Sequence, residues 1–246
     1  MADRNSLRLS GTLLLIGLVV YEMLQFPHPG SPTPTDQAQF AAYAMSSNWA
    51  AIHLGEFLGV AINTAGLLVL FLALDVSQGA PRWLGFFAAI SAAAAGALAA
   101  VVYAVDGVAL KQAVDAWASA PAAEQATRFA GAEAIRWLET GTRSYQEFAS
   151  GVALVLFGTA IVWTARIARP IGYLMGLSGL LLIVMSWVAG TQGLGASIRG
   201  ALFEFVILSS AVWTIWLFVV ALRMKESVEA STPVGQAPTV SSPSTT

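Results

Sequence analysis

Six separate segments of the chain are each apolar enough, over about 20 residues, to cross a lipid bilayer. The hydrocarbon layer is about 30 Å thick and a helix rises about 1.5 Å per residue, which sets that length. Within lipid, a backbone satisfies its hydrogen bonds only inside helices or closed barrels. The sequence therefore predicts an all-α, polytopic membrane protein built as a six-transmembrane-helix bundle. The predicted spans cover residues 7–24, 48–74, 81–105, 145–166, 170–189 and 198–222.

The low share of charged residues supports this interpretation and excludes several kinds of function. Only 11% of the 246 residues are charged and 57% are hydrophobic, whereas soluble domains carry about 25% charged residues. The net charge of -2 supplies no basic field, so we expect no nucleic-acid partner. The chain has no cysteine, which rules out disulfides, thiolate metal sites and iron–sulfur clusters. The expected partners are the lipid bilayer and either another membrane protein or further copies of the chain in a homo-oligomer.

Basic residues in the short connections predict the orientation of the bundle. Lysine and arginine are enriched in short cytoplasmic loops. Arg82 lies at the start of the third span, and Arg166 and Arg169 lie between the fourth and fifth, so these two connections are predicted to be cytoplasmic. Both chain ends then lie in the cytoplasm (N-in, C-in). We expect a multi-pass protein of a bacterial plasma (inner) membrane.

The segments outside the spans have patterns of their own. Arg4 and Arg8 precede the apolar run of the first span, as in a signal peptide, but no small-x-small cleavage site follows closely. We expect the first helix to be retained, and its cleavage would leave five spans. Residues 25–47 and 106–144 are predicted outer loops. Residues 226–246 are rich in Ser, Thr and Pro and are predicted to be a disordered cytoplasmic tail.

Both outer loops are predicted to contain helices. In the first loop, Asp36 is suited to cap a short helix with Phe40 and Tyr43 on its apolar side. In the second loop, two helical stretches are separated near Pro121. The later stretch has an apolar face, so we expect it to lie on the membrane surface or across the top of the bundle. That face comprises Phe129, Ala130, Ala134, Trp137 and Leu138, and the polar face comprises Glu124, Arg128, Arg136 and Glu139.

Polar side chains in or beside the predicted spans are the candidate functional residues, because an ionisable group in lipid is costly. In the predicted topology the ionisable ones all fall in the outer half or at the outer edge of the membrane. An outward-facing acidic cavity would accommodate them together. The candidate binding residues are Glu22, His53, Glu56, Asn63, Asp106, Glu147 and Glu204.

His53 and Glu56 are three residues apart and Asn63 follows about two turns later, so the three share one helix face. A histidine with carboxylates suits a metal ion or a proton relay. The alternative is a hydrogen-bond network that only holds the helices together. The second histidine, His28, lies in a Pro-rich loop and is expected to be solvated. The sequence therefore leads us to assign no metal site, no cofactor and no catalytic residue.

The dipeptide Glu-Phe occurs three times, each near the outer end of a span that runs inward. Its occurrences begin at Glu56, Glu147 and Glu204. This regularity suggests three pseudo-repeated helical hairpins, formed by spans one and two, three and four, and five and six. The hypothesis predicts that the three glutamates lie at similar depth and face a shared interior.

Two further stretches stand out, NWAAIHLGEFLGVAINTAGLLVL at residues 48–70 and VDGVALKQAVDAW at residues 105–117. They resemble uncharacterised bacterial six-helix integral membrane proteins, a family catalogued only as a domain of unknown function. The resemblance extends over nearly the whole chain apart from the tail. It implies six helices and brings no activity, cofactor or site residue with it.

Three classes of function remain open from the sequence. The first is binding or transport of a small cation, a proton or an amphiphile through the acidic cavity. The second is a non-catalytic subunit or scaffold of a larger membrane complex, in contact through Ala- and Gly-rich helix faces. The third is an outer-leaflet enzyme on a lipid-linked substrate, with Glu56 or Glu147 as acid or base and His53 as partner. Binding or transport is our working hypothesis, and a non-enzymatic role is favoured.

Overall fold

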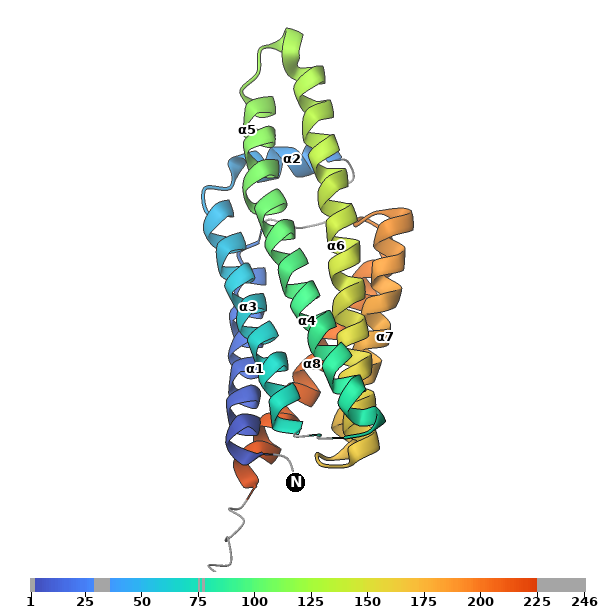
Figure 1. The fold of residues 1–246 in the computed structure, drawn as a ribbon. Helices are drawn as coiled ribbons and strands as arrows, with labels where there is room; N and C mark the ends of the chain where they lie inside the picture. The colour runs from blue at the N-terminus through green and yellow to red at the C-terminus, as the bar shows by residue number, and fades with distance from the viewer. Residues whose placement is uncertain (1–2, 29–35, 75, 77, 225–246) are drawn as a thin grey trace, which may run out of the picture.

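The computed structural model describes residues 3–28, 36–74, 76 and 78–224, and every regular element in these residues is helical (Figure 1). The predicted tail, residues 226–246, lies outside the described residues. In chain order the elements are α1 (Arg4–Gln25), α2 (Asp36–Met45), α3 (Trp49–Leu74), α4 (Ala80–Ala104), η1 (Val105–Leu110), α5 (Lys111–Ala118), α6 (Ala122–Thr164), α7 (Arg169–Gln192) and α8 (Ser197–Arg223).

Six of the described helices are long and apolar enough to cross a membrane, which confirms that part of the sequence prediction. They are α1, α3, α4 with its continuation, α6, α7 and α8. Each packs mainly against its neighbours in chain order, and α8 also packs against α1. The six spans therefore form a closed ring around a central axis, so side chains from every span can face the same interior.

Residues 106–144 contain two helical stretches separated at Pro121, as the sequence predicted, but both stretches continue directly from the spans. The helix α4 continues through the π-helical turn η1 into α5, and α6 runs for 43 residues. Figure 1 shows α5 and the first part of α6 rising as a hairpin beyond the bundle instead of lying across its top. The stretch from Arg82 to α5 contains no proline, so nothing breaks the helix until Pro121, which directly precedes α6.

Glycines bring two pairs of spans together at the level of the backbone. A Cβ atom added at Gly158 of α6 would lie 2.5 Å from the carbonyl oxygen of Gly172 in α7. A Cβ atom added at Gly59 of α3 would lie 2.9 Å from the backbone nitrogen of Tyr21 in α1. Close approach through small residues is how helices gain packing energy in lipid, where the hydrophobic effect between them is absent.

Two clusters of buried apolar side chains fill the two ends of the molecule. The larger cluster lies at the end where the N-terminus is found, and it includes Leu7, Leu70, Phe157 and Leu217. The smaller cluster seats α2 against α3, α5 and α6 at the opposite end, and it consists of Phe40, Tyr43, Trp49, Leu110, Val114, Trp117 and Ala132.

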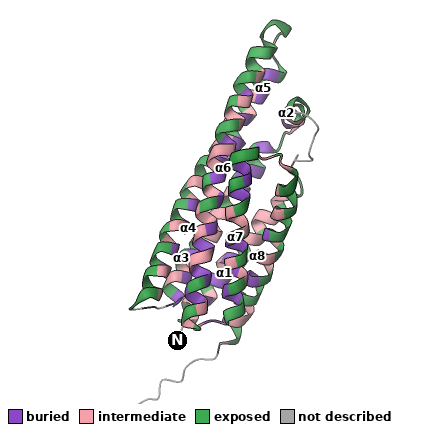
Figure 2. Cartoon of the chain, turned by 90° about the vertical axis from the view of Figure 1, so that its right-hand side faces the viewer, coloured by how far each residue is buried: buried purple, intermediate pink, exposed green. Residues whose placement is uncertain are grey.

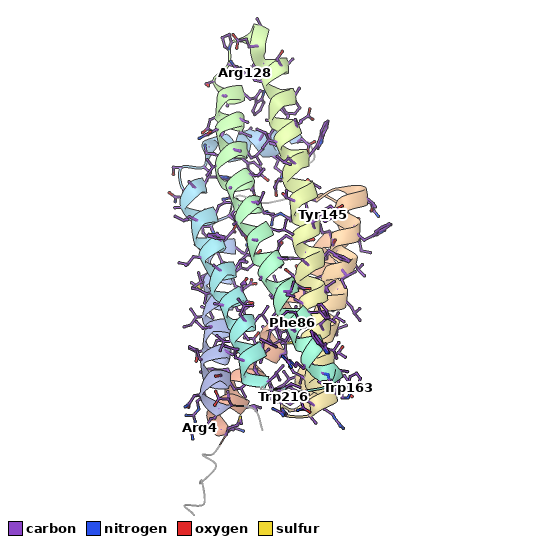
Figure 3. The ribbon with its side chains drawn as sticks, in the orientation of Figure 1. Arg4, Phe86, Arg128, Tyr145, Trp163 and Trp216 are labelled. Carbon is purple, nitrogen blue, oxygen red and sulfur yellow. The ribbon has the colours of Figure 1, made fainter. Side chains whose placement is uncertain are left out.

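The outer surface of the ring is apolar, as a lipid environment requires. Figure 2 shows exposed residues along the outer sides of the spans and buried residues toward the interior. Large exposed apolar side chains include Leu58, Phe87 and Leu208. Figure 3 places Trp163 and Trp216 toward the end of the bundle that carries Arg4. Tryptophan near the ends of spans is typical of membrane proteins.

Candidate functional site

Two adjoining cavities occupy the interior of the ring. The deep cavity has a volume of about 240 Å³ and is lined by residues of all six spans. The polar cavity has a volume of about 290 Å³ and lies toward the end that carries α2, whose residues Gln39 and Tyr43 contribute to its wall. Four residues line both cavities, so the two spaces share a wall, and these are Tyr21, Arg143, Arg199 and Phe203.

A chain of ion pairs crosses the polar cavity. Asp106 in η1 lies 3.2 Å from Nε2 of His53 and 3.0 Å from Nη2 of Arg143, in both cases through Oδ2. Arg143 also lies 3.0 Å from Glu139, which is paired in turn with Arg136. Asp106 and Glu139 are almost completely buried. Such groups are retained in a low-dielectric interior only when opposite charges and hydrogen bonds compensate their lost hydration.

The backbone around η1 is arranged to bring Asp106 against His53. A Cβ atom added at Gly107 would lie only 2.7 Å from Cβ of His53, so glycine is needed for η1 to approach α3 this closely. Trp49 reinforces the contact, because its Nε1 donates a hydrogen bond of 2.9 Å to the backbone carbonyl of Asp106. The same indole stacks on the imidazole of His53, with 4.3 Å between ring centroids. His53 is thereby held in one orientation.

His28 joins this cluster, which corrects the prediction that it is solvated. It lies in the connection after α1, half-buried, and its Nε2 is 3.4 Å from Nε2 of His53. Burial and then the charge of His53 lower the pKa of His28 to about 4, so its imidazole is neutral at pH 7. No pattern in the sequence indicates this contact, because it depends on how the connection folds back over α3.

Glu56 is buried in the same region, one turn along α3 from His53. Gln25 at the end of α1 donates a hydrogen bond of 2.9 Å from Nε2 to Oε1 of Glu56. Among the described residues Glu56 forms no ion pair with a lysine or arginine. The ligand atoms of His28, His53 and Glu56 lie within 4.8 Å of one another, which is close enough to hold one metal ion.

The deep cavity combines apolar walls with a few polar groups. Glu147 of α6 is paired with Arg199, whose Nη1 lies 2.9 Å from Oε2 of the carboxylate. Glu22 and Asn63 also line this cavity, and no ion pair to Glu22 is found among the described residues. At the end next to the buried apolar cluster, the indole N–H of Trp213 is buried and has no hydrogen-bond acceptor within the described part of the chain. A buried donor without a partner is costly.

The predicted candidate residues therefore divide into three groups. Glu56 and Asp106 line the polar cavity and His53 contacts Asp106, whereas Glu22, Asn63 and Glu147 line the deep cavity. Glu204 is exposed on α8 and lines neither cavity. The glutamates of the three Glu-Phe dipeptides thus do not face the shared interior that the hypothesis of three repeated hairpins predicts.

Sequence reasoning missed the arginines of the site, so the expected acidic cavity is in fact mixed in charge. The sequence periodicity predicts Arg136 and Glu139 on the solvated side of a surface helix. It places Arg143 at the end of the predicted outer loop. The spacing of these residues continues the inner face of α6 back from Glu147, which is the signal that could have placed them inside. The two cavities together carry the carboxylates of Glu22, Glu56, Asp106, Glu139 and Glu147 and the guanidinium groups of Arg136, Arg143 and Arg199.

Comparison of the chain with protein-family models, with curated proteins and with solved structures finds no match. The resemblance to an uncharacterised bacterial family stays a prediction. The function is therefore inferred from the geometry of the two cavities.

Proposed function

We propose that this protein binds a small amphiphilic cation in the deep cavity, as a receptor or as the binding stage of a transporter. In the proposed orientation it spans a bacterial plasma membrane with both ends in the cytoplasm. The polar cavity then lies toward the outer side, and the larger buried apolar cluster lies toward the inner side. A ligand would enter past Tyr21 and Arg143, which line both cavities.

The observation that carries the proposal is the uncompensated carboxylate of Glu22 in a cavity whose walls are largely apolar. Each of the three arginines in the cavity walls is already paired with a carboxylate. Glu22 has no such partner among the described residues. The two cavities together are lined by five carboxylates and three guanidinium groups, so the interior as a whole carries excess negative charge. A carboxylate in a low-dielectric space attracts a cation far more strongly than it would in water.

The size and walls of the deep cavity suit an organic cation better than a bare ion. Leu67, Leu154, Leu182 and Val206 contribute apolar walls that a hydrated inorganic ion would not fill. The volume of about 240 Å³ exceeds the roughly 150 Å³ of a protein cavity that holds benzene. An aromatic or branched amine of slightly more than benzene size therefore fits the space.

Benzyltrimethylammonium is a suitable probe, and neopentylbenzene is its neutral isostere. We expect saturable binding of one benzyltrimethylammonium per chain to purified protein in lipid nanodiscs, measured by equilibrium dialysis. The isostere should compete poorly, because it lacks the charge that Glu22 attracts. Glu22→Gln should weaken binding at least about tenfold, the equivalent of roughly 1.4 kcal/mol.

Glu204→Gln is the matched control, because it removes a carboxylate from the exposed surface of the same bundle. It should leave the affinity unchanged. Equal loss of binding in the two variants, or equal affinity for the cation and its isostere, would rule out the proposed role of Glu22. Absence of any saturable binding to the folded wild-type protein would favour the scaffold function.

A further inference from the structure

The polar cavity holds a cluster of ligand atoms that the binding of an organic cation does not use. Two imidazoles and a carboxylate converge there from two parts of the chain. His28 comes from the connection after α1, and His53 and Glu56 come from one face of α3. This donor set, with no thiolate, is the one that zinc and neighbouring divalent transition metals accept in proteins.

The spacing of the two imidazoles matches shared coordination of one ion. Zinc–nitrogen bonds are about 2.0–2.1 Å long, so two ligands at corners of a tetrahedron lie about 3.3–3.4 Å apart. The observed separation between Nε2 of His28 and Nε2 of His53 is 3.4 Å. Oδ2 of Asp106 lies 3.2 Å from the same His53 nitrogen, so a second carboxylate stands beside these ligands.

The surroundings of His53 prepare its Nε2 to act as a ligand. Its Nδ1 lies 2.8 Å from the backbone carbonyl of Trp49, an acceptor, so Nδ1 carries a proton. Nε2 is then the nitrogen that binds the metal ion, after it releases to solvent the proton of its ion pair with Asp106. Metal-binding histidines commonly hold their second nitrogen in this way, and the contact fixes the ring orientation. The hydrogen bond from Gln25 to Oε1 of Glu56 likewise fixes the orientation of that carboxylate.

Asp106 supplies a second, independent sign that a cation binds here. Its Oδ1 is buried and has no hydrogen-bond partner among the described residues, although the side chain is only 4% exposed. Arg143 and His53 both contact the other oxygen, Oδ2. An unpartnered carboxylate oxygen at a buried position is costly unless a cation or a donor compensates it.

We propose that His28, His53 and Glu56 bind one divalent transition-metal ion of the zinc type. The neighbouring carboxylate of Asp106 adds to the negative charge of Glu56 that compensates the ion. The ion ties the connection after α1 to α3 beside the polar cavity. This site is separate from the deep cavity, so metal binding and binding of an organic cation can succeed or fail independently.

Cobalt(II) and zinc(II) are the probes for this site, used with full-length protein in nanodiscs and with a histidine-free affinity tag that is removed before measurement. We expect one Zn²⁺ per chain by calorimetric titration. Co²⁺ should give the intense visible bands of tetrahedral coordination and should be displaced by Zn²⁺. X-ray absorption of the zinc form should show two imidazoles, which must be His28 and His53 because the chain has only two histidines.

His28→Gln is the decisive variant, because His28 lies outside the spans and its loss spares the helix packing. We expect it to weaken Zn²⁺ binding by more than about 100-fold, the upper end of what loss of an outer-shell partner costs. Glu204→Gln should bind Zn²⁺ like the wild type. An octahedral Co²⁺ spectrum, or equal Zn²⁺ affinity in His28→Gln and Glu204→Gln, would show that His53 and Asp106 form only a structural ion pair.

Discussion

Arg199 and Glu147 meet across the wall of the deep cavity and join α8 to α6 through two hydrogen bonds. One runs from Nη1 to Oε2 over 2.9 Å, and the second joins Nη2 to Oε1. The two residues are 52 positions apart in the sequence, and both side chains are largely buried. This two-point contact fixes the guanidinium plane as well as its charge, so it orients one side of the cavity.

The first prediction concerns that pair. Arg199→Met should lower the free energy of unfolding by about 3–5 kcal/mol, because it leaves the carboxylate of Glu147 buried without compensation. The double variant Arg199→Met with Glu147→Leu should recover much of the loss, since no buried charge remains. Denaturation in mixed micelles, followed by tryptophan fluorescence, measures both. Arg128→Met, which breaks an exposed pair with Glu124, is the control and should change stability by less than about 1 kcal/mol.

The second prediction tests the contact between α6 and α7. Gly158→Ala should destabilise the protein by about 1–3 kcal/mol, because the new Cβ would meet the backbone of α7, which cannot move aside cheaply. Gly176→Ala provides the comparison, since a Cβ at that position meets no atom within 4 Å among the described residues. It should be neutral or stabilising through its better helix propensity. Equal destabilisation by the two substitutions would mean that the close approach at Gly158 is not formed.

The third prediction concerns alkaline pH. Tyr43 of α2 is buried, and desolvation raises the pKa of its phenol above the usual value of about 10. The folded state therefore keeps the proton more tightly than the unfolded state. The stability that Tyr43 contributes is complete below about pH 10 and is lost as the pH rises through the folded-state pKa. Tyr43→Phe should remove part of the loss of stability above about pH 10. An identical alkaline decline in wild type and variant, measured by denaturant titration, would contradict the burial of the phenol.

The fourth prediction tests the proposed orientation in the membrane. Because the chain lacks cysteine, single cysteines report accessibility without background. Ala123 lies exposed near the tip of the α5–α6 hairpin, and Gln78 lies exposed in the connection between α3 and α4. A membrane-impermeant maleimide should label Ala123→Cys in intact spheroplasts and Gln78→Cys only after permeabilisation. The reverse pattern would invert the bundle and place the polar cavity on the cytoplasmic side.

Much of the candidate site was accessible to sequence reasoning, but its partners were not. His53, Glu56 and Glu147 were identified because a polar residue stands out against an apolar span. Arg143 escaped notice because it lies just before the apolar run of its span begins, at the edge of a predicted loop. His28 escaped because its neighbours are Pro and Gly residues of a connection with no periodicity. A hydropathy pattern shows where a charged residue interrupts an apolar span. It does not show which oppositely charged residue compensates that charge, because the two residues are far apart in the sequence.

The sequence by itself determined that the chain forms six helices that suit a membrane, because each apolar segment must satisfy its backbone hydrogen bonds internally. It also determined where the long hairpin turns, because Pro121 cannot continue the helix that precedes it. Only the tertiary structure decided which polar groups meet. The closed ring brings Arg199 to Glu147, η1 brings Asp106 to His53, and the connection after α1 brings His28 to the same point. Those pairings depend on the rotation of each helix about its axis, which side-chain packing sets and composition does not.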